Sequence, residues 1–200
     1  MSSLLEMLTQ QLGGGATQQI SRQIGADEQG TSKAMAAALP LLLGALTRNA
    51  SQGAGAESLH RALANDHDGS ILDDIGGFLG QAQAGPGDGI LKHALGGKRQ
   101  VVERQLGASS GLDAASLAKL LPILAPIVMG ALGKAQRSNN LDAQGLAGLL
   151  GGETETMQSQ HPNTMGFLGQ ILDADGDGDV DVSDIAGQGL GFLSKFMGGR

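Results

Sequence analysis

The sequence predicts an all-α fold, on three observations. Apolar side chains recur at steps of three and four residues, the spacing of one helix face; Leu5, Leu8 and Leu12 are the first such set. No segment alternates apolar and polar residues cleanly, so strand signals are poor. The 200 residues are 40% hydrophobic but only 2% aromatic, with 34 glycines and neither Trp nor Tyr. We therefore expect a core of closely packed leucine and alanine side chains on helices.

Further helices follow along the chain by the same spacing. Ile20 and Ile24 mark one, and Val102 and Leu106 mark another. Asp113 is a predicted N-cap for a helix that opens at Ala114, because its carboxylate can accept hydrogen bonds from free backbone N–H groups. Glycine-rich breaks are expected between the helices, at residues 13–15, 53–55, 85–89 and 151–152.

Two apolar runs, Ala34–Leu46 and Leu120–Leu132, are the most hydrophobic parts of the sequence. Each is 13 residues long and contains proline, whereas a helix that spans a bilayer needs about 20 apolar residues. We expect both runs to be buried core helices, and we expect no membrane association. The first twelve residues lack a basic region and do not resemble a signal peptide. A cytoplasmic protein is the expectation, with secretion by a signal-less route left open.

An internal duplication is predicted from a shift of 82 residues. Gly14–Ala26 then lies over Gly96–Ala108, with seven of thirteen positions identical. The same shift places Leu39-Pro40 on Leu121-Pro122, and about four extra residues then precede the match at Gly130. We expect two helical units, residues 1–84 and 85–200, each ending in a helix, an acidic loop and a helix.

The C-terminal acidic loop, residues 173–184, carries the sharpest chemical signal in the sequence. An EF-hand loop binds Ca²⁺ through loop positions one, three, five, seven, nine and twelve, and it turns on a glycine at position six. Gly178 stands at position six, and Asp184 stands where the usual ligand is Glu. The shorter side chain at position twelve leaves Mg²⁺ open beside Ca²⁺. The predicted metal ligands are Asp173, Asp175, Asp177, Asp179 (through its backbone carbonyl), Asp181 and Asp184.

The alternative is an acidic surface turn that holds no ion, but six carboxylates this close repel one another unless a cation compensates them. A first acidic loop, residues 65–74, is a weaker candidate. Asp66, Asp68 and Asp74 can be aligned with the later ligands only with a one-residue deletion, and Ala64 then takes the first ligand position. A turn that caps helices is the favoured interpretation here, and a second weak metal site is the alternative.

Charge and composition exclude several function classes. The chain has 13 Lys and Arg against 20 Asp and Glu, a net charge of −7, and its basic residues are scattered. A nucleic-acid-binding surface is therefore not expected. The absence of Cys excludes a thiolate zinc site, a disulfide and a cysteine nucleophile. No arrangement of His, Ser or acidic residues indicates catalysis, and no small-molecule substrate is indicated.

The chain resembles the YidB-like family of bacterial proteins, domain of unknown function 937. The resemblance is carried by the duplicated Gly-Gly-x-x-Gln units, the Leu-Pro-x-Leu helices, and residues 66–80 and 172–199. It implies an all-α fold, homeodomain-like in the smaller members, and a bacterial origin. It implies no activity and no catalytic residues.

These observations together predict a non-enzymatic, calcium-binding structural or interaction protein. It is expected to form a homo-oligomer or to bind a protein partner, with self-association through the apolar helices at residues 34–46 and 116–132. The alternative, resting on fold analogy alone, is a nucleic-acid-binding regulator.

Overall fold

The computed structural model describes residues 3–81 and 86–160, and the regular structure within these ranges is entirely helical, which confirms the predicted all-α class. The helices follow one another through short connections, most of them of two to four residues. In chain order the elements are α1 (Leu4–Gln11), α2 (Gly15–Ile24), α3 (Glu28–Ser51), α4 (Gly55–Asp66), η1 (Ser70–Leu72), α5 (Ile75–Gln81), α6 (Gly87–Leu95), η2 (Gly96–Lys98), α7 (Arg99–Ser110), α8 (Ala114–Ser138) and α9 (Ala143–Gln160).

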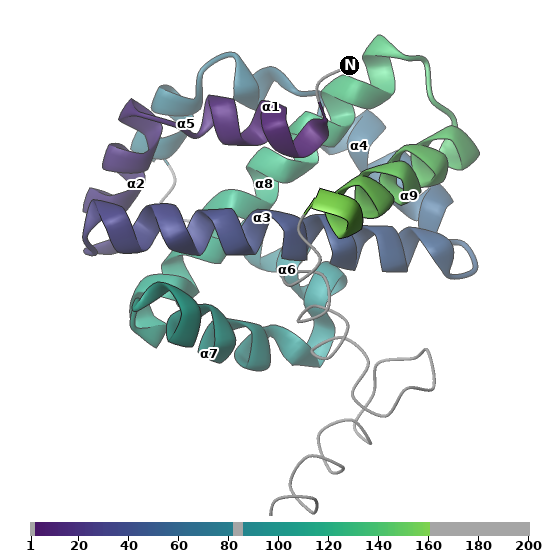
Figure 1. Ribbon diagram of the computed structural model, residues 1–200. Coiled ribbons are helices and arrows are strands. Elements are labelled where there is room, and N and C mark those ends of the chain that lie inside the picture. The colour runs from purple at the N-terminus through teal and green to yellow at the C-terminus, as the bar shows by residue number, and fades with distance from the viewer. Residues whose placement is uncertain (1–2, 82–85, 161–200) are drawn as a thin grey trace, which may run out of the picture.

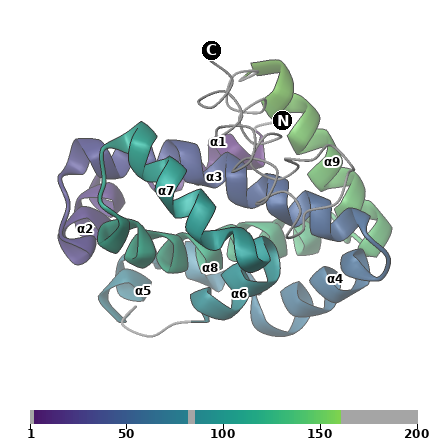
Figure 2. The same cartoon turned by 90° about the horizontal axis from the view of Figure 1, so that it is seen from below.

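Two long helices, α3 and α8, form the centre of the molecule and the other helices surround them (Figure 1). In this view α3 runs across the middle, with α1 on one side of it and α7 on the other, while α8 passes behind it. Seen from below, α6 and α7 lie over the same side of the molecule (Figure 2). The buried side chains of all these helices make one continuous hydrophobic cluster, which includes Leu8, Leu42, Leu91 and Leu124.

The helices of the two predicted units are interlocked. Helices α1 and α2 contact α8 as well as α3, and α6 and α7 contact α3 as well as α8. Helix α9 packs along α3 and α4. The predicted boundary at residues 84 and 85 falls among residues 82–85, outside the described part of the chain. The division into two units therefore stays a prediction, and the described helices share a single core.

Glycines with positive φ recur at fixed offsets along the chain. Gly14 and Gly96 have φ of 58° and 53°, and they lie 82 residues apart. Gly25 and Gly111, 86 residues apart, both end a helix in the left-handed region, where a side chain would be strained.

The offset of 86 also relates the starts of the two long helices. Asp27 caps α3 by accepting from Gly30 N at 2.7 Å, and Asp113 caps α8 by accepting from Ser116 N at 2.7 Å, as predicted for Asp113. The four extra residues therefore precede α8, which pairs Pro40 with Pro126. The sequence alignment of Pro40 with Pro122 was one helical turn out of register.

Both apolar runs are buried within the long central helices, as predicted. Most of residues 34–46 and 116–132 face the core of the same chain, and self-association through these runs stays a prediction. Helix α8 is the one helix in the described ranges that is long and apolar enough to cross a membrane, with a mean hydropathy of 1.8 over its most apolar window. Because 78% of that window is buried in the fold, α8 has the surroundings of a core helix.

Three of the four predicted glycine-rich breaks fall at helix starts, and the prediction at residues 151–152 was wrong. Residues 13–15 and 53–55 precede or open α2 and α4, and Gly87 opens α6, although Gly89 lies within that helix. Gly151 and Gly152 lie inside α9, although each glycine costs about 1 kcal/mol in a helix. The packing of α9 explains this, since Leu146, Leu150 and Met157 are buried against the core and offset the cost.

Candidate functional site

The predicted metal ligands of the C-terminal acidic loop, Asp173, Asp175, Asp177, Asp179, Asp181 and Asp184, lie outside the described residues. The first acidic loop lies within them and forms the predicted arrangement, a helix, an acidic turn and a helix. Helix α4 ends at Asp66, η1 forms at residues 70–72, and α5 begins at Ile75. Gly69 adopts φ of 90° and reverses the chain between α4 and η1.

The carboxylates of this loop bond to nearby donors. Asp68 Oδ1 accepts from Ser70 N at 2.9 Å and from Ser70 Oγ at 2.6 Å. These two hydrogen bonds, the one from Oγ foremost, hold the pKa of Asp68 below its ordinary value, with a smaller contribution from Arg137. Asp74 Oδ1 accepts from Gly77 N at 2.8 Å in the first turn of α5, and Asp66 is exposed at the end of α4.

This arrangement matches the capping interpretation that the sequence favoured for the first loop. Within residues 3–81 and 86–160, no group of three or more His, Asp or Glu side chains is placed to hold a metal ion. Asp66, Asp68 and Asp74 are therefore not brought together as a ligand set. Two of the three accept hydrogen bonds from the backbone a few residues further on, which is the usual role of aspartate in a turn.

The first acidic loop packs directly on the backbone of α8, and two glycines make this approach possible. A Cβ atom built on Gly133 would lie 1.7 Å from the carbonyl oxygen of His67, and one built on Gly130 would lie 2.2 Å from Ile71 Cγ2. At Gly69 the same construction meets Lys134 Cβ at 2.8 Å. The loop thus fills a notch in α8 that any larger side chain would close.

Charged side chains on α8 hold the loop at its edges. Lys134 Nζ lies 3.0 Å from Asp73 Oδ1, and Arg137 Nη1 lies 3.8 Å from Asp68 Oδ2. Arg137 Nη2 also donates to the carbonyl oxygen of Ala64 at 3.2 Å, at the end of α4. These ion pairs are exposed and each contributes little by itself. Together they hold α4 and the first acidic loop in position over Gly130 and Gly133 of α8.

His67 is half-buried between the loop and α8. Burial lowers its pKa below the ordinary value of 6.5, and the neighbouring charge of Asp66 opposes that shift. At neutral pH the imidazole is therefore uncharged, and a proton would have to enter a partly desolvated position.

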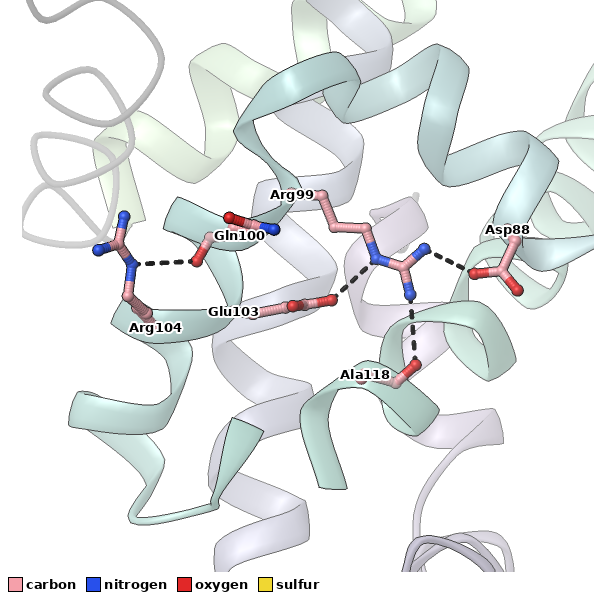
Figure 3. Close-up of polar contacts among 6 residues, drawn as sticks. All are labelled: Asp88, Arg99, Gln100, Glu103, Arg104 and Ala118. Carbon is pink, nitrogen blue, oxygen red and sulfur yellow. Dashed lines mark hydrogen bonds and ion pairs between the residues drawn. The ribbon is translucent and has the colours of Figure 1, made fainter. Parts of the chain in front are cut away.

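A second polar cluster, which was not among the sites predicted from the sequence, centres on Arg99 at the start of α7. Arg99 Nε donates to Glu103 Oε1 at 2.8 Å, and its Nη1 donates to Asp88 Oδ1 at 2.6 Å (Figure 3). Its Nη2 donates to the carbonyl oxygen of Ala118 at 3.4 Å. The hydrogen bond with Glu103, followed by that with Asp88, raises the pKa of Arg99.

The hydrogen bond from Arg99 to the carbonyl of Ala118 is explained by a proline within α8. Pro122 has no backbone N–H, so the carbonyl of Ala118, four residues earlier, loses its usual partner inside α8. Arg99 supplies the missing donor and joins α6, α7 and α8 at one point. All three groups that face Arg99 are satisfied within the chain, so the cluster serves structure. Two spacings in the sequence could have indicated it: four residues from Arg99 to Glu103, and four from Ala118 to Pro122.

Residues 6–135 match the family described as bacterial protein of unknown function (DUF937). The chain belongs to the DUF937 family. No curated protein and no solved structure matches it.

The DUF937 match extends from α1 into the last part of α8. It includes the first acidic loop, the glycine notch of α8 and the cluster around Arg99. It ends before α9 and before the C-terminal acidic loop.

Proposed function

We propose that this DUF937 protein is a non-enzymatic calcium-binding interaction protein, in which the interlocked helices are a rigid body and residues 173–184 form the metal site. The observation that carries this proposal is the ligand pattern of the C-terminal acidic loop. Aspartates stand at positions one, three, five, seven, nine and twelve, and Gly178 stands at position six. The YidB-like assignment and a cytoplasmic location belong to the same proposal.

The two acidic loops differ in a way that supports this choice. In the first loop, Asp68 and Asp74 are followed within two or three residues by the backbone N–H groups that they accept from. That use needs only one carboxylate at each turn. The C-terminal loop has six carboxylates in twelve residues, more than two turns can use, and their mutual repulsion favours a bound cation.

Binding of Ca²⁺ at such a loop would order the segments on either side of it, because the ligands must converge on one point. The proposed role is to order a surface for a second copy of this chain or for another protein. The buried faces of the central helices are occupied by the chain's own core, so that surface would lie elsewhere on the molecule. Asp184, shorter than the usual Glu by one methylene, would weaken the preference for Ca²⁺ over Mg²⁺.

Calorimetric titration of the chelator-treated full chain with CaCl₂ and with MgCl₂ tests the proposal. The wild type should bind about one Ca²⁺ per chain, and Asp173→Asn/Asp177→Asn should not bind. The matched control is Asp66→Asn/Asp68→Asn, which removes the same charge from the first loop and should still bind. Equal heats from the wild type and the Asp173/Asp177 variant would refute the metal site. Light scattering with refractive-index detection, with and without Ca²⁺, tests self-association.

A nucleic-acid-binding regulator remains the second candidate, on one specific observation. Helices α2 and α3, and again α7 and α8, are joined by three residues that include a left-handed glycine, as in helix-turn-helix proteins. The described residues after these turns include both Glu28 and Lys119, so the following helices lack a consistent positive charge. A gel shift with duplex DNA at moderate salt would support this candidate, and an unshifted duplex would remove it.

A further inference from the structure

The face of α3 around Gly44 corresponds to the face of α8 that the first acidic loop covers. The offset of 86 residues that relates the caps of the two helices places Gly44 on Gly130 and Arg48 on Lys134. On α8, Gly130 receives Ile71 and Lys134 pairs with Asp73 at 3.0 Å. The two helices thus carry a glycine and a cation in the same relative positions.

The α3 face differs from the α8 face in what covers it. Among the described residues, no atom from outside α3 lies within 4 Å of a Cβ atom built on Gly44, whereas Ile71 lies 2.2 Å from one built on Gly130. One turn along α3, Thr47 is already in contact with α9, since its Oγ1 lies 3.1 Å from Thr154 Oγ1. The space over Gly44 is therefore bordered by α9, the helix from which the rest of the chain continues.

The length and sequence of that continuation fit this space. Forty residues follow Gln160, and they contain the C-terminal acidic loop. In the alignment of the two loops, Val180 corresponds to Ile71 and Gly178 to Gly69. Val180 is a branched side chain of the kind that fills the notch at Gly130, and the acidic residues beside it are opposite in charge to Arg48.

We propose that the C-terminal acidic loop docks on α3 with Val180 over Gly44 and its carboxylates toward Arg48, as the first acidic loop docks on α8. The interaction surface is the half-buried part of α3 at Gly44 and Arg48, and its occupant is this chain's own residues 173–184. The docking goes beyond the proposed calcium site and does not require a bound ion.

Paramagnetic broadening in NMR spectra tests the docking, because the chain has no cysteine and a single one can be introduced for a nitroxide label. Ser51 is exposed and lies seven residues after Gly44, about 10 Å along the helix. A label on Ser51→Cys should broaden the amide signals of residues 173–184. As the positive control, a label on Ser138→Cys at the end of α8 should broaden residues 67–74.

A second substitution separates docking at Gly44 from mere proximity. Gly44→Leu fills the proposed position and should abolish the broadening caused by the Ser51 label. Gly89→Leu is the matched control, since Gly89 is an exposed helical glycine with nothing within 4 Å of its built Cβ, and it should leave the broadening unchanged.

Three results would overturn the proposal. The first is that the Ser51 label leaves the amide signals of residues 173–184 sharp while the Ser138 label broadens those of the first acidic loop. The second is that the broadening caused by the Ser51 label survives Gly44→Leu. The third result is broadening only between chains, when labelled and isotopically enriched molecules are mixed, which would make a second copy the occupant. Spectra with chelator and with Ca²⁺ keep this test apart from calorimetry, because broadening in either condition supports docking even if no ion binds.

Discussion

Replacing Gly133 with alanine places a methyl group where the backbone of the first acidic loop now lies. The new Cβ atom would be 1.7 Å from His67 O and 3.0 Å from His67 C. Both are backbone atoms, so no side-chain rotation can relieve the clash. The loop must move away from α8, or α8 must bend.

The size of the effect follows from two opposing contributions. Alanine in place of glycine inside a helix stabilises it by about 1 kcal/mol, while overpacking a close contact costs about 1–3 kcal/mol. Gly148→Ala provides the first contribution alone, because Gly148 is exposed within α9 and its built Cβ has nothing within 4 Å. The free energies of unfolding of the two variants should therefore differ by about 1–3 kcal/mol. For a chain of this size, that corresponds to a difference in Tm of about 2–12 °C.

Thermal and urea unfolding, followed by far-UV circular dichroism, measure this difference in a chain that has neither Trp nor Tyr. Gly148→Ala should raise the Tm above that of the wild type, and Gly133→Ala should lie below Gly148→Ala. Equal shifts in the two variants would mean that the first acidic loop is not packed on α8, and the notch would have no structural role.

Three further predictions concern charged groups. Arg99→Lys should lower the free energy of unfolding in urea by about 1 kcal/mol, because lysine cannot reach all three partners. The control is Arg104→Lys, at an exposed side chain, which should change the free energy of unfolding by less than about 0.5 kcal/mol. Equal effects of the two substitutions would refute the stabilising role of the Arg99 cluster. The pKa of His67 is lowered in the folded state, so the contribution of His67 to the free energy of unfolding is complete above pH 6.5 and is lost as the pH falls below that value. The decline in Tm on acidification should therefore be smaller in His67→Gln than in the wild type. An unchanged decline would contradict the lowered pKa of His67. The pKa of Asp113 is lowered chiefly by the hydrogen bond from Ser116 N, so the contribution of Asp113 to the free energy of unfolding is present above pH 3.8 and is lost as the pH falls further. Asp113→Asn should therefore make Tm depend less on pH below 3.8. Measurements of Tm across this range of pH check the prediction.

The features that the sequence predicted correctly depend on local chemistry. The spacing of Leu5, Leu8 and Leu12 predicts a helix, and α1 buries Leu8 with Leu12 directly after it, although Leu5 is only half-buried. The carboxylate of Asp113 can find its donor within three residues, so the start of α8 was predicted to the residue. The capping role of Asp68 and Asp74 was favoured for the same reason, since each accepts from a donor close in sequence.

The features that were missed depend on contacts between distant parts of the chain. Gly151 and Gly152 break a helix by propensity, but α9 gains enough burial against α3 to continue through them. The shared Leu-Pro pair aligns Pro40 with Pro122 in sequence, whereas the caps of the two helices align it with Pro126, one helical turn further on. The partners of Arg99 come from three helices, and no sequence window contains all of them.

The interlocking of the helices has a consequence for how this protein is made. Helix α3 is complete early in synthesis, yet much of its apolar surface is covered by α7 and α9, and α9 is complete only 109 residues after the end of α3 (160 − 51). At typical translation rates the nascent chain must therefore protect that surface for about 5–20 seconds. Ribosome-bound chains stalled before α7 should accordingly bind a holdase chaperone, and chains stalled well beyond α9 should release it.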